Sequence, residues 1–177
     1  MKSRSRGQTG VIAAICLSLG LSFSAYSQTQ APAPNAVQKE APMTTHATGT
    51  FEVKLNPQTP DGKFEDATLG RMTIDKQFHG DLEATSKGQM LTAATDVKGS
   101  AGYVAIERVT GTLHGRSGSF VLQHTGTLTR GVPQLSVTVV PDSGTGQLVG
   151  LTGKMNIIIN AGKHSYDFEY TLAQAPN

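Results

Sequence analysis

The strongest constraint on the fold is the spacing of apolar residues, which recur at every second position from Thr48 onward. In "TGTFEVKL" (48–55), for example, Phe51 and Val53 alternate with polar residues. A period of two places successive side chains on opposite faces of a β-strand, whereas an amphipathic helix needs a period of 3.6. The chain therefore predicts an all-β fold and has no credible amphipathic helix.

Seven further runs with this alternation are separated by segments rich in Gly, Asp and Ser. They cover 68–78, 82–95, 103–113, 119–129, 134–140, 148–160 and 164–172. Lys87-Gly88 interrupts the second strand of this set, which could be two pieces around a bulge. Short connections imply antiparallel neighbours, and about eight such strands usually remove their exposed edges by closing into a barrel. We predict an eight-stranded antiparallel β-barrel, with a two-sheet sandwich as the alternative.

The residues before the predicted barrel form two different segments. Residues 1–27 combine a basic start, an apolar run and small residues at Ala25 and Ser27, which is the layout of a secretory signal peptide cleaved after Ser27. Residues 28–45 are rich in Pro and poor in large apolar side chains, so we expect a flexible tether. The predicted barrel domain is 46–173, followed by a tail at 174–177. We expect an exported protein, periplasmic or secreted, with no stable membrane anchor after cleavage.

Cleavage would also change the charge and the thiol content of the chain. The only cysteine, Cys16, lies in the predicted signal peptide, so the mature protein would have neither a disulfide nor a cysteine nucleophile. The mature chain keeps all 13 acidic residues but only 12 of the 15 basic ones, a net charge of −1. Such a balance gives no long-range attraction for nucleic acid or anionic lipid.

His124 is the first candidate for a ligand-binding residue. It shares a predicted strand face with Phe120 and Leu122, which favours an inward orientation. A neutral histidine inside the barrel could relay a proton or orient a ligand oxygen. The alternative is a buried histidine that bonds to a backbone carbonyl or a Thr hydroxyl and has only a structural role.

Glu107 and Arg108 are neighbours on one strand, so they must point to opposite faces. Both faces of this strand carry apolar residues, and the pattern does not choose the inner one. A charged side chain that faces inward needs a partner, because an unpaired buried charge is costly. Glu83 is a possible neighbour for Arg108. Tyr103 shares the face of Glu107 and is a candidate with it.

The last strand has the cleanest alternation in the chain. Its apolar face carries Tyr166, Phe168 and Tyr170. Most stripes of this kind are core, but tyrosine hydroxyls in a cavity also bind polar ligand groups.

Other kinds of chemistry have little support in the sequence. The histidines are not paired at metal-ligand spacing, so we predict no metal site and no cofactor. The segment "GRSGS" (115–119) lies in a predicted hairpin and not at the strand-to-helix turn of a serine hydrolase. The segment "GTGQLVGLTG" (144–153) lacks the Lys-Ser or Lys-Thr pair of a phosphate-binding loop.

Three blocks of the chain resemble a known bacterial family. They are "HATGTFEVK" (46–54), "IERVTGTLHGRSGSFVLQHTGT" (106–127) and "VVPDSGTGQLVGLTG" (139–153). Together they are similar to the family called domain of unknown function 3224, over nearly all of 46–172. The resemblance implies a barrel related to allene oxide cyclase and, more distantly, to plant dirigent proteins. It implies no particular reaction, since a fold does not determine a function.

Three functions are compatible with these observations. The leading hypothesis is an exported barrel that binds a small, mostly apolar molecule in its interior. The second is a cyclase- or isomerase-like enzyme that uses the barrel interior, with His124 and an inward Glu or Tyr as proton-transfer groups. The third is a structural or interaction module of the cell envelope. The sequence decides neither whether the protein is an enzyme nor its oligomeric state.

Overall fold

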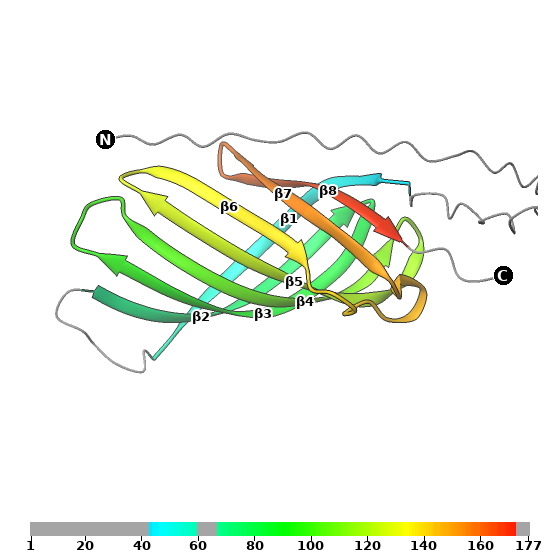
Figure 1. Cartoon of the computed structure of the whole chain (residues 1–177), viewed down its shortest axis with the longest axis horizontal. Coiled ribbons are helices and arrows are strands. Elements are labelled where there is room, and N and C mark those ends of the chain that lie inside the picture. The colour runs from blue at the N-terminus through cyan, green and yellow to red at the C-terminus, as the bar shows by residue number, and fades with distance from the viewer. Residues whose placement is uncertain (1–42, 60–66, 173–177) are drawn as a thin grey trace, which may run out of the picture. The chain divides into compact units, whose positions relative to one another are not determined.

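The predicted barrel is confirmed by a computed structural model, in which eight antiparallel strands close on themselves in sequence order (Figure 1). The structure describes residues 43–59 and 67–172. The predicted signal peptide, most of the tether and the tail lie outside these residues. The strands are β1 (Thr45–Gln58), β2 (Ala67–Gly80), β3 (Leu82–Thr95), β4 (Ala101–Leu113), β5 (Arg116–Thr129), β6 (Val132–Val139), β7 (Leu151–Asn160) and β8 (Lys163–Leu172).

Tight turns hold neighbouring strands in register. In the turn between β4 and β5, Leu113 pairs with Arg116, and His114 and Gly115 between them have φ of 46° and 76°. Two consecutive positive φ values are typical of the type I′ turn, whose twist matches that of a hairpin. The "HGRSG" segment is therefore a hairpin, as the sequence predicts.

The bulge that the sequence allowed in β3 is absent. Lys87 pairs with Asp75 on one side and with Arg108 on the other, and the pairing continues through Gly88 without an extra residue. The interruption in the apolar pattern has a different cause, which is that Gly88 lies directly beside the side chain of Glu107. A Cβ atom added at Gly88 would come within 3.0 Å of the Glu107 Cβ.

The loop between β6 and β7 completes the barrel wall where β6 ends. The predicted strand at 148–160 begins only at Leu151, and a short 3₁₀ turn occupies Gly146–Leu148. This loop bonds to the backbone of β5: the Thr145 amide donates to the Ser119 carbonyl at 2.8 Å, and the Val121 amide donates to the Ser143 hydroxyl at 3.0 Å. The block "VVPDSGTGQLVGLTG" therefore has a structural role.

One half of the barrel holds a continuous apolar core, and we call it the closed half. Its aromatic rings pack in pairs, with Phe120 stacked on Phe168 at a centroid distance of 5.7 Å and Phe78 edge-on to Tyr166 at 5.7 Å. Leu148 of the 3₁₀ turn is also buried in this cluster. The closed half is filled by side chains, as the interior of a small barrel usually is.

The opposite half has a gap in its wall, and we call it the flared half. Of the described residues in β6 and β7, only Thr138 and Lys154 pair with each other, and the two strands diverge from there (Figure 1). β8 pairs with β1 only as far as Phe51, although β1 continues to Gln58 alongside β2. Strands β1 to β6 thus extend beyond the short β7–β8 hairpin.

The described residues contain no helix that is long and apolar enough to span a membrane.

Candidate functional site

Four polar side chains meet inside the barrel, between its closed and flared halves. They come from four consecutive strands: Lys76 from β2, Ser86 from β3, Glu107 from β4 and His124 from β5. All four are buried, and the Glu107 side chain is completely inaccessible to solvent. Because they lie on neighbouring strands at inward-facing positions, they form one connected polar cluster.

Glu107 is the centre of this polar cluster. Its Oε2 accepts a hydrogen bond from the Lys76 ammonium at 2.7 Å, and its Oε1 accepts one from the Ser86 hydroxyl at 2.6 Å. His124 Nε2 lies 3.1 Å from Oε2, but its alignment falls short of a hydrogen bond, and this buried nitrogen has no other partner among the described residues. The Lys76 ammonium also lies 5.0 Å from the Phe51 ring centroid and 5.6 Å from that of Phe78.

The cluster keeps Glu107 ionised. Burial by itself would raise the pKa of this carboxyl, but the nearby His124 ring, the Lys76 ammonium and the Ser86 hydroxyl outweigh burial and lower the pKa to about 2. An ionised carboxylate paired with an ammonium makes Lys76 and Glu107 a buried ion pair without net charge.

We expect this pair to make the stability of the protein sensitive to acid. The pKa of Glu107 is lowered on folding, so its contribution is complete above the ordinary value near 4.5 and is lost as the pH falls toward 2. The loss should amount to about 2–3 kcal/mol. Urea unfolding curves at pH 7, 4.5 and 3 measure it. A Glu107→Gln variant should lose correspondingly less stability over the same range, and equal losses in both proteins would contradict this assignment.

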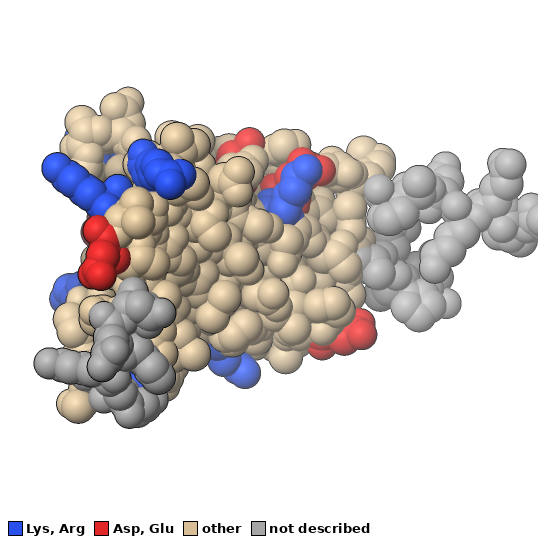
Figure 2. All heavy atoms as spheres, turned by 60° about the vertical axis from the view of Figure 1, so that its left-hand side comes forward, with Lys and Arg blue, Asp and Glu red and all other residues tan. Residues whose placement is uncertain are grey.

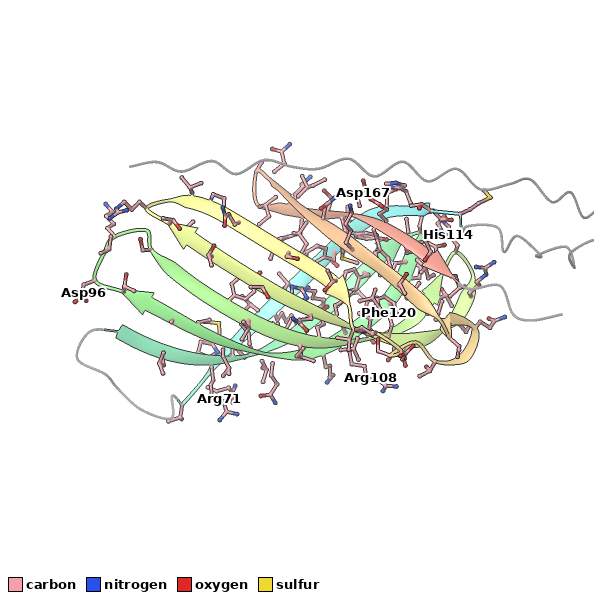
Figure 3. All side chains as sticks on the ribbon, in the orientation of Figure 1. Arg71, Asp96, Arg108, His114, Phe120 and Asp167 are labelled. Atoms are coloured by element: carbon pink, nitrogen blue, oxygen red, sulfur yellow. The ribbon has the colours of Figure 1, made fainter. Side chains whose placement is uncertain are left out.

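The choice between Glu107 and Arg108 is settled by the strand register. Glu107 points inward, and Arg108 is exposed on the outside of the barrel, as Figure 3 shows. Arg108 donates a hydrogen bond to the Ser119 hydroxyl at 2.9 Å, and the suggested contact with Glu83 is absent. Glu83 is exposed and accepts from the Gly80 amide at 2.8 Å, because it too alternates to the outer face. Both residues therefore face the outside of the barrel and not its interior.

Most of the predicted aromatic site residues belong to the closed half. Phe120, Tyr166, Phe168 and Tyr170 are buried in its core cluster. The two hydroxyls have protein partners: Tyr166 accepts from the Leu82 amide at 2.9 Å, and Tyr170 lies 2.8 Å from His114 Nδ1. These residues therefore pack the core. Tyr103 differs, since it is only partly buried and packs against a small second cluster formed by Ile74, Met90 and Ala105.

The flared half is lined by apolar side chains that are not fully covered. Leu55, Leu135 and Ile159 occupy inward-facing positions by strand alternation, yet they are 48%, 44% and 65% exposed. Val53 and Met72 lie in the same half and are partly buried. The polar cluster separates this apolar surface from the closed core. A small molecule with an apolar body would thus meet apolar walls and, at their base, a charged pair.

Sequence reasoning missed Lys76 and Ser86. The signal for Lys76 was present, because the inward stripe of β2 runs Met72, Ile74 and Phe78 with Lys76 in the position between the last two. A lysine that interrupts an otherwise apolar stripe needs a buried counter-charge. Glu107 supplies this counter-charge from β4, two strands away. The pairing could therefore not be recognised from the sequence around Lys76 alone.

Other parts of the described structure offer weaker candidates. Residues 43–59 and 67–172 contain no group of three or more His, Asp or Glu side chains that could hold a metal ion. A pocket of about 220 Å³ on the β7–β8 wall is lined by Lys154 and Glu169, which pair with each other at 3.2 Å, and by Thr152 and Thr171, whose hydroxyls lie 2.8 Å apart. Its polar groups are already satisfied by one another.

The geometry limits the acid–base chemistry that the polar cluster could perform. A carboxylate with a pKa of about 2 is a weak general base near neutral pH, since an efficient base has a pKa close to the working pH. Glu107 also has its oxygens engaged by Lys76 and Ser86. The cluster is better suited to binding than to removing a proton from a substrate.

Comparison with known proteins places these features in a family. The family model described as "Protein of unknown function (DUF3224)" matches residues 47–170. A crystal structure of a DUF3224 protein with unknown function from Shewanella oneidensis MR-1 is 52% identical, covers 75% of this chain and 100% of its own, and superposes with a TM-score of 0.72. No curated protein matches the chain. The expected relation to allene oxide cyclase stays a prediction.

Proposed function

We propose that this chain, which belongs to the DUF3224 family, is a binding protein for a small, mostly apolar molecule. The molecule would be held in the flared half of the barrel. The proposal locates the site away from the aromatic closed half, where the interior is occupied by packed side chains.

One observation carries this proposal, namely the exposure of apolar side chains that point toward the barrel interior. Leu55, Leu135 and Ile159 lie on three different strands and are each 44% exposed or more. Scattered apolar residues on an outer surface are ordinary, but inward-facing ones are normally buried. A bound molecule that covered them would gain roughly 25 cal/mol for each Å² of apolar surface removed from water.

The distribution of charge agrees with an uncharged ligand. The face shown in Figure 2 has a broad central area without Lys, Arg, Asp or Glu. Within the polar cluster the charges of Lys76 and Glu107 cancel. Neither feature offers long-range attraction to a highly charged partner.

The proposal is tested by the binding of N-phenyl-1-naphthylamine, a neutral apolar dye whose fluorescence rises in an apolar environment. We expect saturable binding, and a Leu135→Gln substitution should raise the Kd about fivefold because it removes about 1 kcal/mol of apolar contact. The control is Leu91→Gln, since Leu91 is 55% exposed but faces outward, and its Kd should equal that of the unmodified protein.

Two outcomes would count against the proposal. If the folded protein does not bind the dye, the proposed binding function has no basis. A larger loss of affinity in Leu91→Gln than in Leu135→Gln would indicate that the dye binds to the outside of β3. That result would favour the interaction-module hypothesis instead.

We also propose that the protein works outside the cytoplasm, on the basis of the predicted signal peptide at 1–27. Mass spectrometry of the protein from cell fractions tests this idea. A mature chain that begins at Gln28 and is found in the periplasm or medium supports it, whereas an uncleaved chain confined to the cytoplasm contradicts it.

A further inference from the structure

The Lys76 ammonium has more hydrogen-bond donors than it has acceptors around it. The Lys76 ammonium has three N–H groups, and Glu107 is its only acceptor among the described residues, at 2.7 Å. Ser86 adds a hydroxyl donor that is also directed at Glu107. His124 Nε2 is buried without a hydrogen-bond partner. Buried polar groups are costly when they are unpaired, so the remaining N–H groups of Lys76 favour an additional acceptor.

Lys76 is the member of the cluster best placed to meet such an acceptor. Its side chain keeps 6% exposure, whereas the Glu107 side chain has none. Lys76 pairs in register with Val53, and the preceding inward-facing residue on β2 is Ile74. Ile74 belongs to the small second cluster described above, and Val53 packs against that cluster. The ammonium is therefore the charged donor at the base of the apolar surface.

Charge decides which kind of acceptor fits. Lys76 and Glu107 already form a neutral pair, so a ligand carboxylate would bring an uncompensated negative charge into a buried site. A ligand ammonium would bring an uncompensated positive charge next to the Lys76 ammonium. A neutral oxygen, such as the carbonyl of a ketone or an ester, supplies an acceptor without adding charge.

We propose, building on the binding function above, that the ligand is an apolar molecule with a neutral carbonyl oxygen that accepts a hydrogen bond from Lys76. The apolar part lies against Leu55, Leu135 and Ile159, and the oxygen lies at the base of the flared half.

The test compares four probes with the same number of carbons: 2-octanone, octane, octanoate and octylammonium. Each is used to displace N-phenyl-1-naphthylamine from the protein at pH 7. We expect the affinity ratio of 2-octanone to octane to be about tenfold higher in the unmodified protein than in a variant without the Lys76 ammonium, because a hydrogen bond from a charged donor contributes about 1.4 kcal/mol or more. The infrared C=O stretch of bound 2-octanone should also lie at lower frequency than in an apolar solvent.

Two variants separate this contact from a structural effect. The double substitution Lys76→Met with Glu107→Gln removes both charges of the pair together, so no buried ion is left unpaired. It should still bind the dye and octane, but its affinity ratio of 2-octanone to octane should fall about tenfold and the infrared shift should be lost. The matched control is Lys87→Met, since Lys87 is an outward-facing lysine on β3 that is 87% exposed, and it should keep both.

The possible outcomes distinguish the two proposals. An affinity ratio of 2-octanone to octane that is unchanged in the double variant, or tightest binding of octanoate or octylammonium, would overturn the carbonyl proposal and leave the apolar binding site intact. Failure of the unmodified protein to bind the dye and all four probes would overturn the proposed function itself.

Discussion

Replacing Glu107 with alanine is expected to lower the free energy of unfolding by about 3–5 kcal/mol, because it leaves the Lys76 ammonium buried without its counter-charge. The Ser86 hydroxyl would lose its acceptor in the same step. Urea unfolding followed by circular dichroism at pH 7 measures the change.

An exposed ion pair provides the control for this prediction. Glu169 on β8 pairs with Lys154 at 3.2 Å, but its side chain is 37% exposed, so Glu169→Ala should cost less than 1 kcal/mol. The two substitutions are chemically identical and differ in burial. Similar losses in both variants would show that the Glu107 carboxylate is not buried against Lys76 as described.

Replacing Phe168 with alanine is expected to destabilise the protein by about 3–5 kcal/mol. The Phe168 ring is fully buried, stacks on Phe120 and lies 5.4 Å from the Tyr170 ring centroid. Its removal would leave a cavity in the most densely aromatic part of the closed half. Thermal and urea unfolding measure the loss, and Ile158→Ala on the neighbouring strand, where the side chain is 51% exposed, should cost less than 1 kcal/mol.

The Phe168→Ala variant also distinguishes the two halves of the barrel. If the ligand lies in the flared half, this variant should bind N-phenyl-1-naphthylamine with unchanged affinity at temperatures where it is folded. A gain of a second dye molecule in the new cavity is compatible with this expectation. A loss of the original binding would place the ligand in the closed half and contradict the proposed location.

The strand pattern predicted the fold well because a barrel is built from local alternation. In β8, the order Tyr166, Phe168, Tyr170 on one face determines which side is buried without reference to any other strand. The pattern could not predict where the barrel is open. That depends on pairing between β6 and β7, which has no signature in either strand alone, since the exposed Leu135 and Ile159 look like ordinary core residues in sequence.

The candidate site was predictable only in part, because its members are paired across strands. His124 was recognised from its apolar neighbours, and Glu107 was recognised as one of two adjacent charges. The choice between Glu107 and Arg108 required the register, since both faces of β4 carry apolar residues: Ile106, for example, lies on the outer face with Arg108 and is 50% exposed. Lys76 was overlooked although it interrupts an apolar stripe.

The location of the ligand is tested most directly by methyl NMR of the protein labelled at Ile, Leu and Val while 2-octanone is added. Binding in the flared half predicts concentration-dependent shifts for the methyl groups of Leu55, Leu135 and Ile159. The outward-facing Leu91, Val104 and Ile106 should stay unchanged. Shifts confined to these outer residues, or to Leu113 and Leu122 in the closed half, would contradict the account.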